Sequence, residues 1–217
     1  MEMIFNIAMA DSHSTSSSVT IKLLYMLKAP VQGAVKTRLA TSIGEMDAAI
    51  AYRSMVEFQL KTLKAFDHEI HYTPAGSIDL MSNWLGADRN YFPQSEGHLG
   101  QRMLKAAEGA FQRKAKSVCL LGGDCPYLTN AIILEANLAL QSHDLVIGPA
   151  KDGGYYLLAF KCTYPTLFEG IAWSTKTVFD ETLSKAKQLD LKVHRLEPLE
   201  DVDEFDSWKR AKALLGK

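Results

Sequence analysis

The most restrictive feature of the sequence is a short apolar run that ends in two glycines and an aspartate. Residues 118–121 are Val-Cys-Leu-Leu, which is typical of a strand buried on both faces of a sheet. Gly122-Gly123 then allow a tight turn or a close approach to a ligand, and Asp124 follows. Because open α/β sheets bind ligands beyond the carboxyl ends of their strands, Asp124 either belongs to a metal–phosphate site or only closes a turn.

Strand-like and helix-like segments alternate along the chain on both sides of this run. The expected strands are residues 21–27, 69–73, 91–92, 118–121, 144–150, 155–160 and 192–196. The expected helices are residues 45–66, 78–85, 99–111, 130–141, 175–189 and 205–215. This order predicts a three-layer α/β/α sandwich with a mostly parallel, Rossmann-like sheet, and the Asp152-Gly153 turn predicts one antiparallel element in it.

Two local signals mark the starts of helices. Ser42 and Glu45 have the spacing of a capping box ahead of the first long helix. Thr129 is the expected N-cap of the helix that follows the central strand.

Composition limits the partners and the compartment. The 217 residues carry a net charge of −1, so no overall field attracts nucleic acid or an anionic membrane. No apolar run is long enough to span a membrane, which needs about 20 residues. The three cysteines have no CxxC spacing and cannot all pair, which favours a reducing, cytoplasmic setting. We expect residues 1–20 to be a flexible, Ser-rich extension and residues 21–217 to form one domain.

The loop after the first strand carries a cluster of cations. Lys28, Lys36 and Arg38 lie within eleven residues, with Gly33 and Thr37 between or beside them and a helix to follow. Phosphate is bound by backbone amides, cationic side chains and helix amino ends, so this loop predicts a phosphate site. The loop is neither a Walker A sequence nor a GxGxxG fingerprint, and a solvated basic loop is the alternative.

Three motifs in matching order give the chain a family resemblance. They are Lys28-Ala-Pro followed by Gly33-x-Val-Lys-Thr-Arg-Leu39, Gly122-Gly-Asp-Cys-Pro126, and Gly148-Pro-Ala-Lys-Asp-Gly-Gly-Tyr-Tyr-Leu157. Together they resemble a bacterial family of glycosyltransferase-like proteins associated with radical-SAM and selenodomain proteins. That family belongs to the nucleotide-diphospho-sugar transferase superfamily, which implies the GT-A fold. The superfamily includes both sugar transferases and nucleotidyltransferases.

The resemblance implies a donor site and a metal site. The donor's phosphates and nucleotide would be held by a set drawn from three segments, namely Lys28, Ala29, Pro30, Gly33, Lys36, Arg38, Arg102, Gly122 and Gly123. Asp124 would bind Mg²⁺ (or Mn²⁺) together with phosphate oxygens and water. Many glycosyltransferases of this fold have an Asp-x-Asp pair here. The single carboxylate of this chain is more similar to the nucleotidyltransferases.

A second metal ligand has two readings. Asp203 precedes the last helix and is similar to the Asp-x-Asp that ends many nucleotidyltransferases of the superfamily. If Asp203 reaches Asp124, the two carboxylates bracket one metal ion. Alternatively, Asp203 and Asp206 are the N-cap and N3 residues of that helix, whose amino end favours negative charge. Asp201 is a weaker candidate than Asp203.

The resemblance also implies an acceptor site. Asp152 would be a general base, with Lys36 as the second catalytic residue, and a base must reach the attacking hydroxyl. The acceptor or sugar would lie against a set that also includes Gly153, Gly154, Tyr155 and Trp173. A plain hairpin turn is the alternative for the Asp152-Gly153 motif. His98 is expected to be a cap or a surface residue, because no partner stands at metal-ligand spacing.

The expected activity is therefore transfer from a nucleotide-activated donor in the presence of Mg²⁺. The leading hypothesis is glycosyl transfer from a nucleotide-diphospho-sugar to a small-molecule acceptor. The first alternative is a nucleotidyltransferase that uses a nucleoside triphosphate and releases pyrophosphate. A non-catalytic nucleotide-binding protein is the second alternative.

Overall fold

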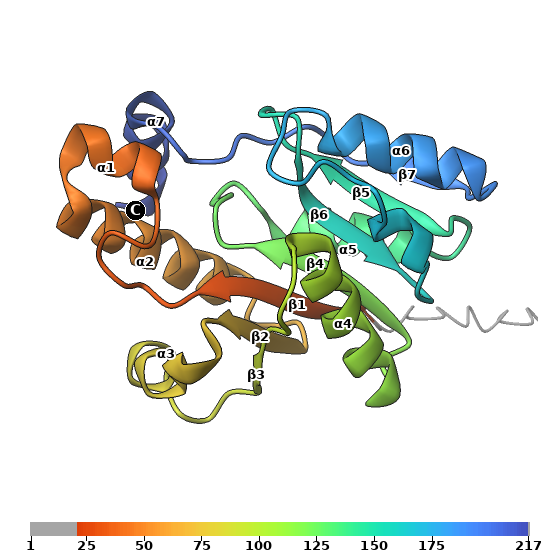
Figure 1. Cartoon of the computed structure of the whole chain (residues 1–217), viewed down its shortest axis with the longest axis horizontal. Helices are drawn as coiled ribbons and strands as arrows, with labels where there is room; N and C mark the ends of the chain where they lie inside the picture. The colour runs from red at the N-terminus through yellow and green to blue at the C-terminus, as the bar shows by residue number, and fades with distance from the viewer. Residues whose placement is uncertain (1–20, 217) are drawn as a thin grey trace, which may run out of the picture.

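The structure is a computed structural model that describes residues 21–216. One mixed sheet lies at the centre of these residues. The sheet has the order β3-β2-β1-β4-β6-β5-β7 (Figure 1). Its strands are β1 (Ile21–Lys28), β2 (His68–Thr73), β3 (Tyr91–Pro93), β4 (Ser117–Gly122), β5 (Leu145–Pro149), β6 (Tyr155–Phe160) and β7 (Val193–Arg195). β6 runs antiparallel to β4 and β5, whereas the other neighbouring pairs are parallel. The predicted mostly parallel sheet with one antiparallel element is confirmed, while the expected extension at residues 1–20 lies outside the described residues.

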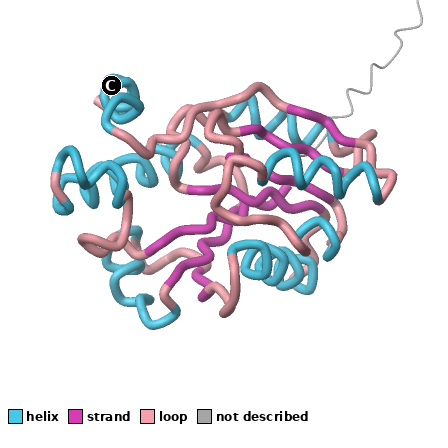
Figure 2. Tube along the Cα trace, turned by 45° about the horizontal axis from the view of Figure 1, so that its top comes forward, coloured by secondary structure: helices cyan, strands magenta, loops and turns pink. Residues whose placement is uncertain are grey.

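Helices cover both faces of this sheet. They are α1 (Thr37–Ile43), α2 (Glu45–Thr62), α3 (Ile78–Leu85), α4 (Leu99–Gln112), α5 (Asn130–Ala139), α6 (Val178–Gln188) and α7 (Phe205–Leu215), with short 3-10 turns at Ala75–Ser77 and Pro165–Phe168. Helices α2, α3 and α5 pack on one face, and α4 and α6 pack on the other (Figures 1 and 2). No described helix is both long enough and apolar enough to cross a membrane.

The central strand β1 shows why the sheet is buried on both sides. Leu23 and Leu27 pack against the layer that contains α2, and Leu24 packs against the layer that contains α4. All three side chains are fully buried. A run without hydrophobic alternation is what a strand between two helical layers requires.

Several helix boundaries differ from the sequence-based expectation. The Ser42–Glu45 capping box is wrong, because Ser42 lies inside α1 and Gly44, at φ 85°, separates α1 from α2. Helix α2 ends at Thr62, earlier than the expected Phe66. Thr129 is confirmed as the N-cap of α5, where its Oγ1 accepts a hydrogen bond from the Ile132 amide.

The C-terminal segment returns across the carboxyl edge of the sheet. After β7 the chain bridges Leu199 to Ala150, and the Val202 amide then donates a 2.9 Å hydrogen bond to the Asp124 carbonyl. Helix α7 packs on α1 and α2, where Trp208 contacts the small cluster around Leu39 (Figure 1). The last segment of the chain is thereby fixed beside the end of β4.

A buried carboxylate ties α4 to the sheet. Glu69 on β2 is 2% exposed, and its Oε2 accepts from Arg113 Nη2 at 2.5 Å and lies 3.1 Å from His71 Nε2. Lys22 Nζ is 3.5 Å from Glu69 Oε1, and the Arg113 guanidinium also stacks on Phe92. Burial raises the pKa of Glu69, but the hydrogen bonds from His71 and Arg113 outweigh it and lower that pKa to about 2.

We expect Glu69→Gln to destabilise the protein in a pH-dependent way. The pKa of Glu69 is about 2 in the folded chain against an ordinary value of 4.5. This difference corresponds to about 3 kcal/mol of unfolding free energy, present at neutral pH and lost as the pH falls from 4.5 towards 2. Chemical denaturation between pH 2 and pH 7 measures the effect.

Glu108→Gln is the matched control, because Glu108 forms a surface pair with Lys105 on the same helix that Arg113 ends. This control should change the free energy of unfolding by less than about 1 kcal/mol. Parallel pH profiles for Glu69→Gln and the wild type would contradict the assigned role of Glu69.

Candidate active site

A cavity of about 870 Å³ lies at the carboxyl ends of β1 and β4. Its walls come from the loop after β1, the loop after β4, the turn between β5 and β6, the segment before α6, and the segment before α7. Gly122, Gly123 and Asp124 all line it. The parallel strands end at this edge and β6 begins there, so the topology alone brings these distant segments together.

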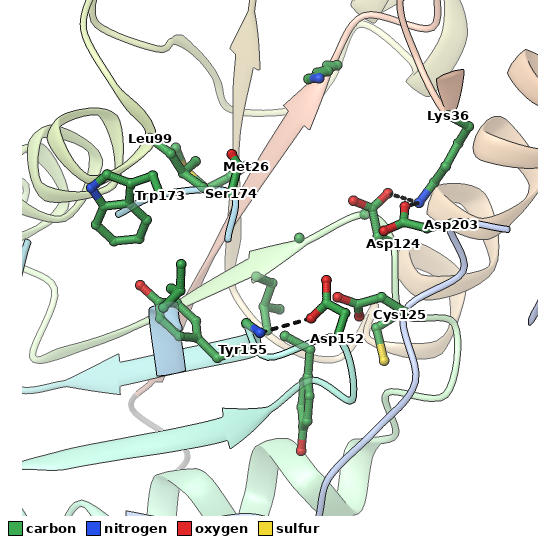
Figure 3. A pocket seen from close by; sticks show the side chains of 18 of the residues that line it. Met26, Lys36, Leu99, Asp124, Cys125, Asp152, Tyr155, Trp173, Ser174 and Asp203 are labelled. Atoms are coloured by element: carbon green, nitrogen blue, oxygen red, sulfur yellow. Dashed lines mark hydrogen bonds and ion pairs between the residues drawn. The ribbon is translucent and has the colours of Figure 1, made fainter. Parts of the chain in front are cut away.

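Four charged side chains form an ionic cluster in this cavity, namely Lys36, Arg38, Asp124 and Asp203. Lys36 Nζ lies 2.6 Å from Asp124 Oδ1 and 2.9 Å from Asp203 Oδ1 (Figure 3). Arg38 Nη2 pairs with the other oxygen of Asp203. The cluster therefore joins the loop after β1, the end of β4 and the C-terminal segment.

Lys36 is the most buried member of the ionic cluster. Its side chain is 3% exposed, whereas that of Asp124 is 47% exposed and that of Arg38 is 62% exposed. Burial alone lowers the pKa of Lys36, but the charges of Asp124 and Asp203 outweigh it, so the pKa is raised and the ammonium stays protonated. At Asp203 burial raises the pKa, but the charge and hydrogen bond of Lys36, together with the charges of Arg38 and Lys28, outweigh it and lower the pKa of that carboxyl.

The backbone of Lys36 is unusual. Lys36 adopts φ 50° and ψ 43°, the left-handed conformation, at the N-cap position of α1. Few residues other than glycine populate this region. The preceding Val35 is almost fully buried and anchors the loop, and Lys36 then extends towards Asp124 (Figure 3). Lys36 thus combines two ion pairs with a left-handed backbone conformation that no sequence signal predicted.

Asp203 pairs with cations instead of capping α7. Glu204 is the N-cap residue, and it forms a capping box with Ser207. The N-cap interpretation of Asp203 is therefore wrong, since the chain enters α7 one residue later than the spacing of Asp203 and Asp206 suggested. Asp203 lies beside the same lysine as Asp124.

Asp152 is both a turn residue and a cavity residue. Its Oδ1 accepts a 2.9 Å hydrogen bond from the Gly154 amide, which closes the predicted turn between β5 and β6. The side chain is exposed and also lines the cavity with Gly154, Tyr155 and Trp173. Gly153 does not line the cavity, and its carbonyl accepts a hydrogen bond from the Phe179 amide.

Several candidate donor residues shape the loops without lining the cavity. These residues are Ala29, Pro30, Gly33 and Arg102. Gly33 has φ 76°, and a Cβ there would approach the Glu45 carboxylate at 3.1 Å. Arg102 Nε donates to the Gly97 carbonyl at 2.7 Å, which closes the turn ahead of α4. Lys28, by contrast, does line the cavity.

Sequence reasoning gave too little weight to Asp201. This residue lines the cavity, and its Oδ1 is buried without a hydrogen-bond partner among the described residues. Burial, together with the charges of Asp124 and Asp152, raises the pKa of Asp201 to about 7. A run of acidic residues before α7 was its only sequence signal, and that signal also fits an exposed helix entry.

Tyr52 was also missed as a cavity residue. It sits on the buried stripe of α2, so the periodicity predicted only a core position. In the structure its hydroxyl accepts from the Lys28 amide at 3.0 Å and donates to the Lys28 carbonyl at 3.2 Å. Tyr52 thereby fixes the end of β1 at the cavity.

His98 is confirmed as a helix cap. His98 caps α4, where Nδ1 accepts from the Gln101 amide at 3.3 Å. Cys119, Cys125 and Cys162 are all free. Within residues 21–216 no group of three or more His, Cys, Asp or Glu is placed to hold a metal ion.

Comparison with known proteins identifies a family and similar structures for this chain. The family model described as "Uncharacterized protein conserved in bacteria (DUF2064)" matches residues 55–175. No curated protein matches the chain. A protein from Desulfovibrio desulfuricans G20, provisionally named a nucleotide-diphospho-sugar transferase, is 31% identical with a TM-score of 0.82. The match covers 91% of this chain and 97% of that protein.

More distant structures share the fold alone. A 4-diphosphocytidyl-2C-methyl-D-erythritol synthase from Anaerococcus prevotii DSM 20548 is 13% identical over 91% of this chain and 98% of that one, with a TM-score of 0.59. A CMP:2-keto-3-deoxy-manno-octonic acid synthetase in complex with CTP is 9% identical over 91% and 98%, with a TM-score of 0.57. The fold is that of the nucleotide-diphospho-sugar transferases.

We expect Lys36→Met to destabilise the protein because it leaves Asp124 and Asp203 facing each other. The loss should be about 2 kcal/mol of unfolding free energy, below the range for fully buried pairs because Asp124 is half-exposed. Methionine is unbranched like lysine, is one atom shorter, and meets the same left-handed backbone, so the loss of charge is the main change. Denaturant titration measures the loss.

Arg38→Met is the control, since it removes an exposed cation from the same ionic cluster and should cost less than about 1 kcal/mol. Adding Asp203→Asn to Lys36→Met should recover part of the loss, which a double-mutant cycle detects. Equal losses for the two single variants would contradict the central position of Lys36.

Proposed function

Because the chain belongs to the bacterial family described as DUF2064, and its fold is that of the nucleotide-diphospho-sugar transferases, we propose that it transfers a glycosyl group from a nucleotide-diphospho-sugar to a small acceptor. The observation that carries this proposal is the ionic cluster at the carboxyl ends of β1 and β4. Two cations and two carboxylates meet there, beside a cavity with room for a donor and an acceptor.

The cations of the ionic cluster suit a leaving diphosphate. An ammonium has three N–H donors, and Lys36 uses two of them on Asp124 and Asp203. The third is left for a phosphate oxygen, while the exposed guanidinium of Arg38 and the side chain of Lys28 reach the same cavity. Fixed positive charge stabilises a phosphate that becomes more negative as the bond to the sugar breaks.

Asp124 and Asp203 fit a divalent metal ion. Mg²⁺ in such sites uses one or two carboxylates and completes its shell with substrate phosphates and water. The two carboxylates already converge on one positive charge, that of Lys36, and Asp124 is open to the cavity. Asp124 and Asp203 would hold Mg²⁺ or Mn²⁺, which supplies Lewis-acid neutralisation of the phosphate oxygens when bound.

Asp152 is the proposed base. In the transfer its carboxylate takes the proton of the acceptor hydroxyl, the acceptor oxygen bonds to the anomeric carbon, and the bond from that carbon to the phosphate oxygen breaks. The nucleoside diphosphate leaves with the bonding electrons. Asp152 Oδ1 is occupied by the Gly154 amide, which orients the carboxylate and leaves Oδ2 for the acceptor.

Nucleotidyl transfer is the second candidate. The end of β4 carries Gly122-Gly123-Asp124, with one carboxylate where many sugar transferases of this fold carry two. In that reaction a nucleophile on the acceptor attacks the α-phosphorus of a nucleoside triphosphate, and pyrophosphate leaves. Incubating the protein and Mg²⁺ with nucleotide sugars or nucleoside triphosphates separates the candidates by release of nucleoside diphosphate or pyrophosphate. Binding without release for any acceptor tested would favour a non-catalytic nucleotide-binding protein.

We expect Asp124→Asn to abolish the Mg²⁺-dependent part of nucleotide binding and to leave the fold intact. A nucleotide at 100 times its dissociation constant stabilises the wild type by about 2.7 kcal/mol. The variant should lose most of this stabilisation, because the amide is a poor ligand for Mg²⁺. Thermal shift with and without Mg²⁺ measures it.

Asp206→Asn is the control for the change of residue type, since Asp206 is 80% exposed on α7. This control should bind the nucleotide like the wild type. If Asp124→Asn retained the full Mg²⁺-dependent shift, the metal role of Asp124 would be refuted.

A further inference from the structure

The cavity has a second part with a different chemistry from the ionic cluster. We call it the apolar lobe, formed by Met26, Leu99, Met103, Tyr155 and Trp173. These side chains belong to the hydrophobic layer between the sheet and α4, or lie at its edge. Leu99 is 41% exposed, a large apolar surface left open at the start of α4. The ionic cluster and the apolar lobe are parts of one cavity (Figure 3).

The tryptophan of the apolar lobe packs directly against the backbone of α4 at a glycine. Gly100 on α4 lies so close to Trp173 that a Cβ on this residue would overlap the indole ring. His98 stacks on the same indole, with ring centroids 6.2 Å apart and planes 20° apart. The amino end of α4 therefore fixes one wall of the lobe.

The segment that carries Trp173 is also fixed at its far end. A Cβ on Gly153 would overlap the Lys176 backbone, so the turn between β5 and β6 needs glycine there to admit this segment. Glu181 on α6 accepts hydrogen bonds from the Ala172 amide and from Thr177 Oγ1, both at 2.7 Å. Two glycines and one carboxylate from three elements thus hold a rigid aromatic wall beside the cavity.

The apolar lobe offers few polar partners. The Tyr155 hydroxyl and Trp173 Nε1 are both buried, so neither atom is accessible to a ligand in the cavity. Thr175 Oγ1 at the rim is engaged with the Ala172 carbonyl and with Thr177. A sugar placed in this lobe would lose its hydrogen bonds to water without replacement, at a cost in free energy.

We propose that the apolar lobe binds the acceptor, and that the acceptor carries its hydroxyl on a flat, apolar body, as an aryl alcohol does. The proposal rests on the proposed function for the meaning of acceptor, but binding in the lobe is measurable without it. Two methionines and a leucine adapt to such a body, while the tryptophan and tyrosine rings supply a large, rigid contact. Asp152, the proposed base, lines the same cavity.

Gly100→Ala tests the lobe with the smallest possible change. Alanine stabilises a helix by up to about 1 kcal/mol relative to glycine, so the substitution should not destabilise α4 itself. The new methyl group must displace Trp173, and the lobe loses its wall. Gly109→Ala is the matched control in the same helix, because a Cβ there meets the Arg113 guanidinium, at 3.1 Å, and no residue of the apolar lobe.

The measurement is binding of 2-naphthol to the full chain by isothermal titration calorimetry. We expect Gly100→Ala to weaken 2-naphthol at least tenfold and Gly109→Ala to leave it unchanged. Trp173→Ala should weaken it similarly, and Trp173→Phe should restore part of the affinity. Uridine, cytidine, adenosine and guanosine, tested as competitors, should not displace the probe.

Other results would overturn the proposal. These are no binding of 2-naphthol to the wild type, equal affinity in Gly100→Ala and Gly109→Ala, or displacement of the probe by a nucleoside, which would make the lobe a base site. Nucleotide-dependent thermal shift in the same variants separates this test from the proposed function. Loss of naphthol binding with an unchanged nucleotide shift supports the lobe, whereas a wild type that binds naphthol but no nucleotide refutes the proposed function alone.

Discussion

The pairing of one buried ammonium with two carboxylates is the interaction on which the site depends. Lys36 comes from the loop after β1, Asp124 from the end of β4, and Asp203 from a segment 167 residues away from Lys36. Without the lysine, two like charges would face each other beside the buried Asp201. The ion pairs hold three segments at one point and keep a left-handed backbone at Lys36. The ion pairs therefore order the site around one positive charge, as the proposed binding of a phosphate requires.

The cavity combines two chemical environments, a charged one at the end of β4 and an apolar one next to α4. Beyond β4, charges gather around Lys36, whereas the layer next to α4 presents methionine, leucine and aromatic side chains. A Cβ on Gly122 would meet nothing within 4 Å, so the end of β4 leaves open space. This division supports the proposed reaction between a charged donor and an apolar acceptor, because each partner would be desolvated by a surface that matches it.

The sequence predicted most elements because their signals are local. The continuous apolar run at residues 118–121 and the alternation of strands with helices were sufficient for the layered sheet, and Thr129 for the start of α5. The capping box at Ser42 failed because Gly44 interrupts the helix, an effect of one backbone angle. The local sequence around Asp203 favoured equally that it caps α7 and that it reaches Asp124. Only the position of the C-terminal segment, pinned through Val202 to Asp124, decided between them.

Three features could be predicted from the sequence alone, namely the fold class, the position of Asp124 at the end of a buried strand, and the cations in the loop after β1. The tertiary structure alone decided that Lys36, among the three cations, is buried between the carboxylates. It also placed Asp201 in the cavity and set Trp173 against Gly100. Hydrophobic periodicity and turn residues act over a few neighbours in the chain. Ion pairs and ring contacts depend instead on strand order and helix packing, which bring together residues that no local pattern relates.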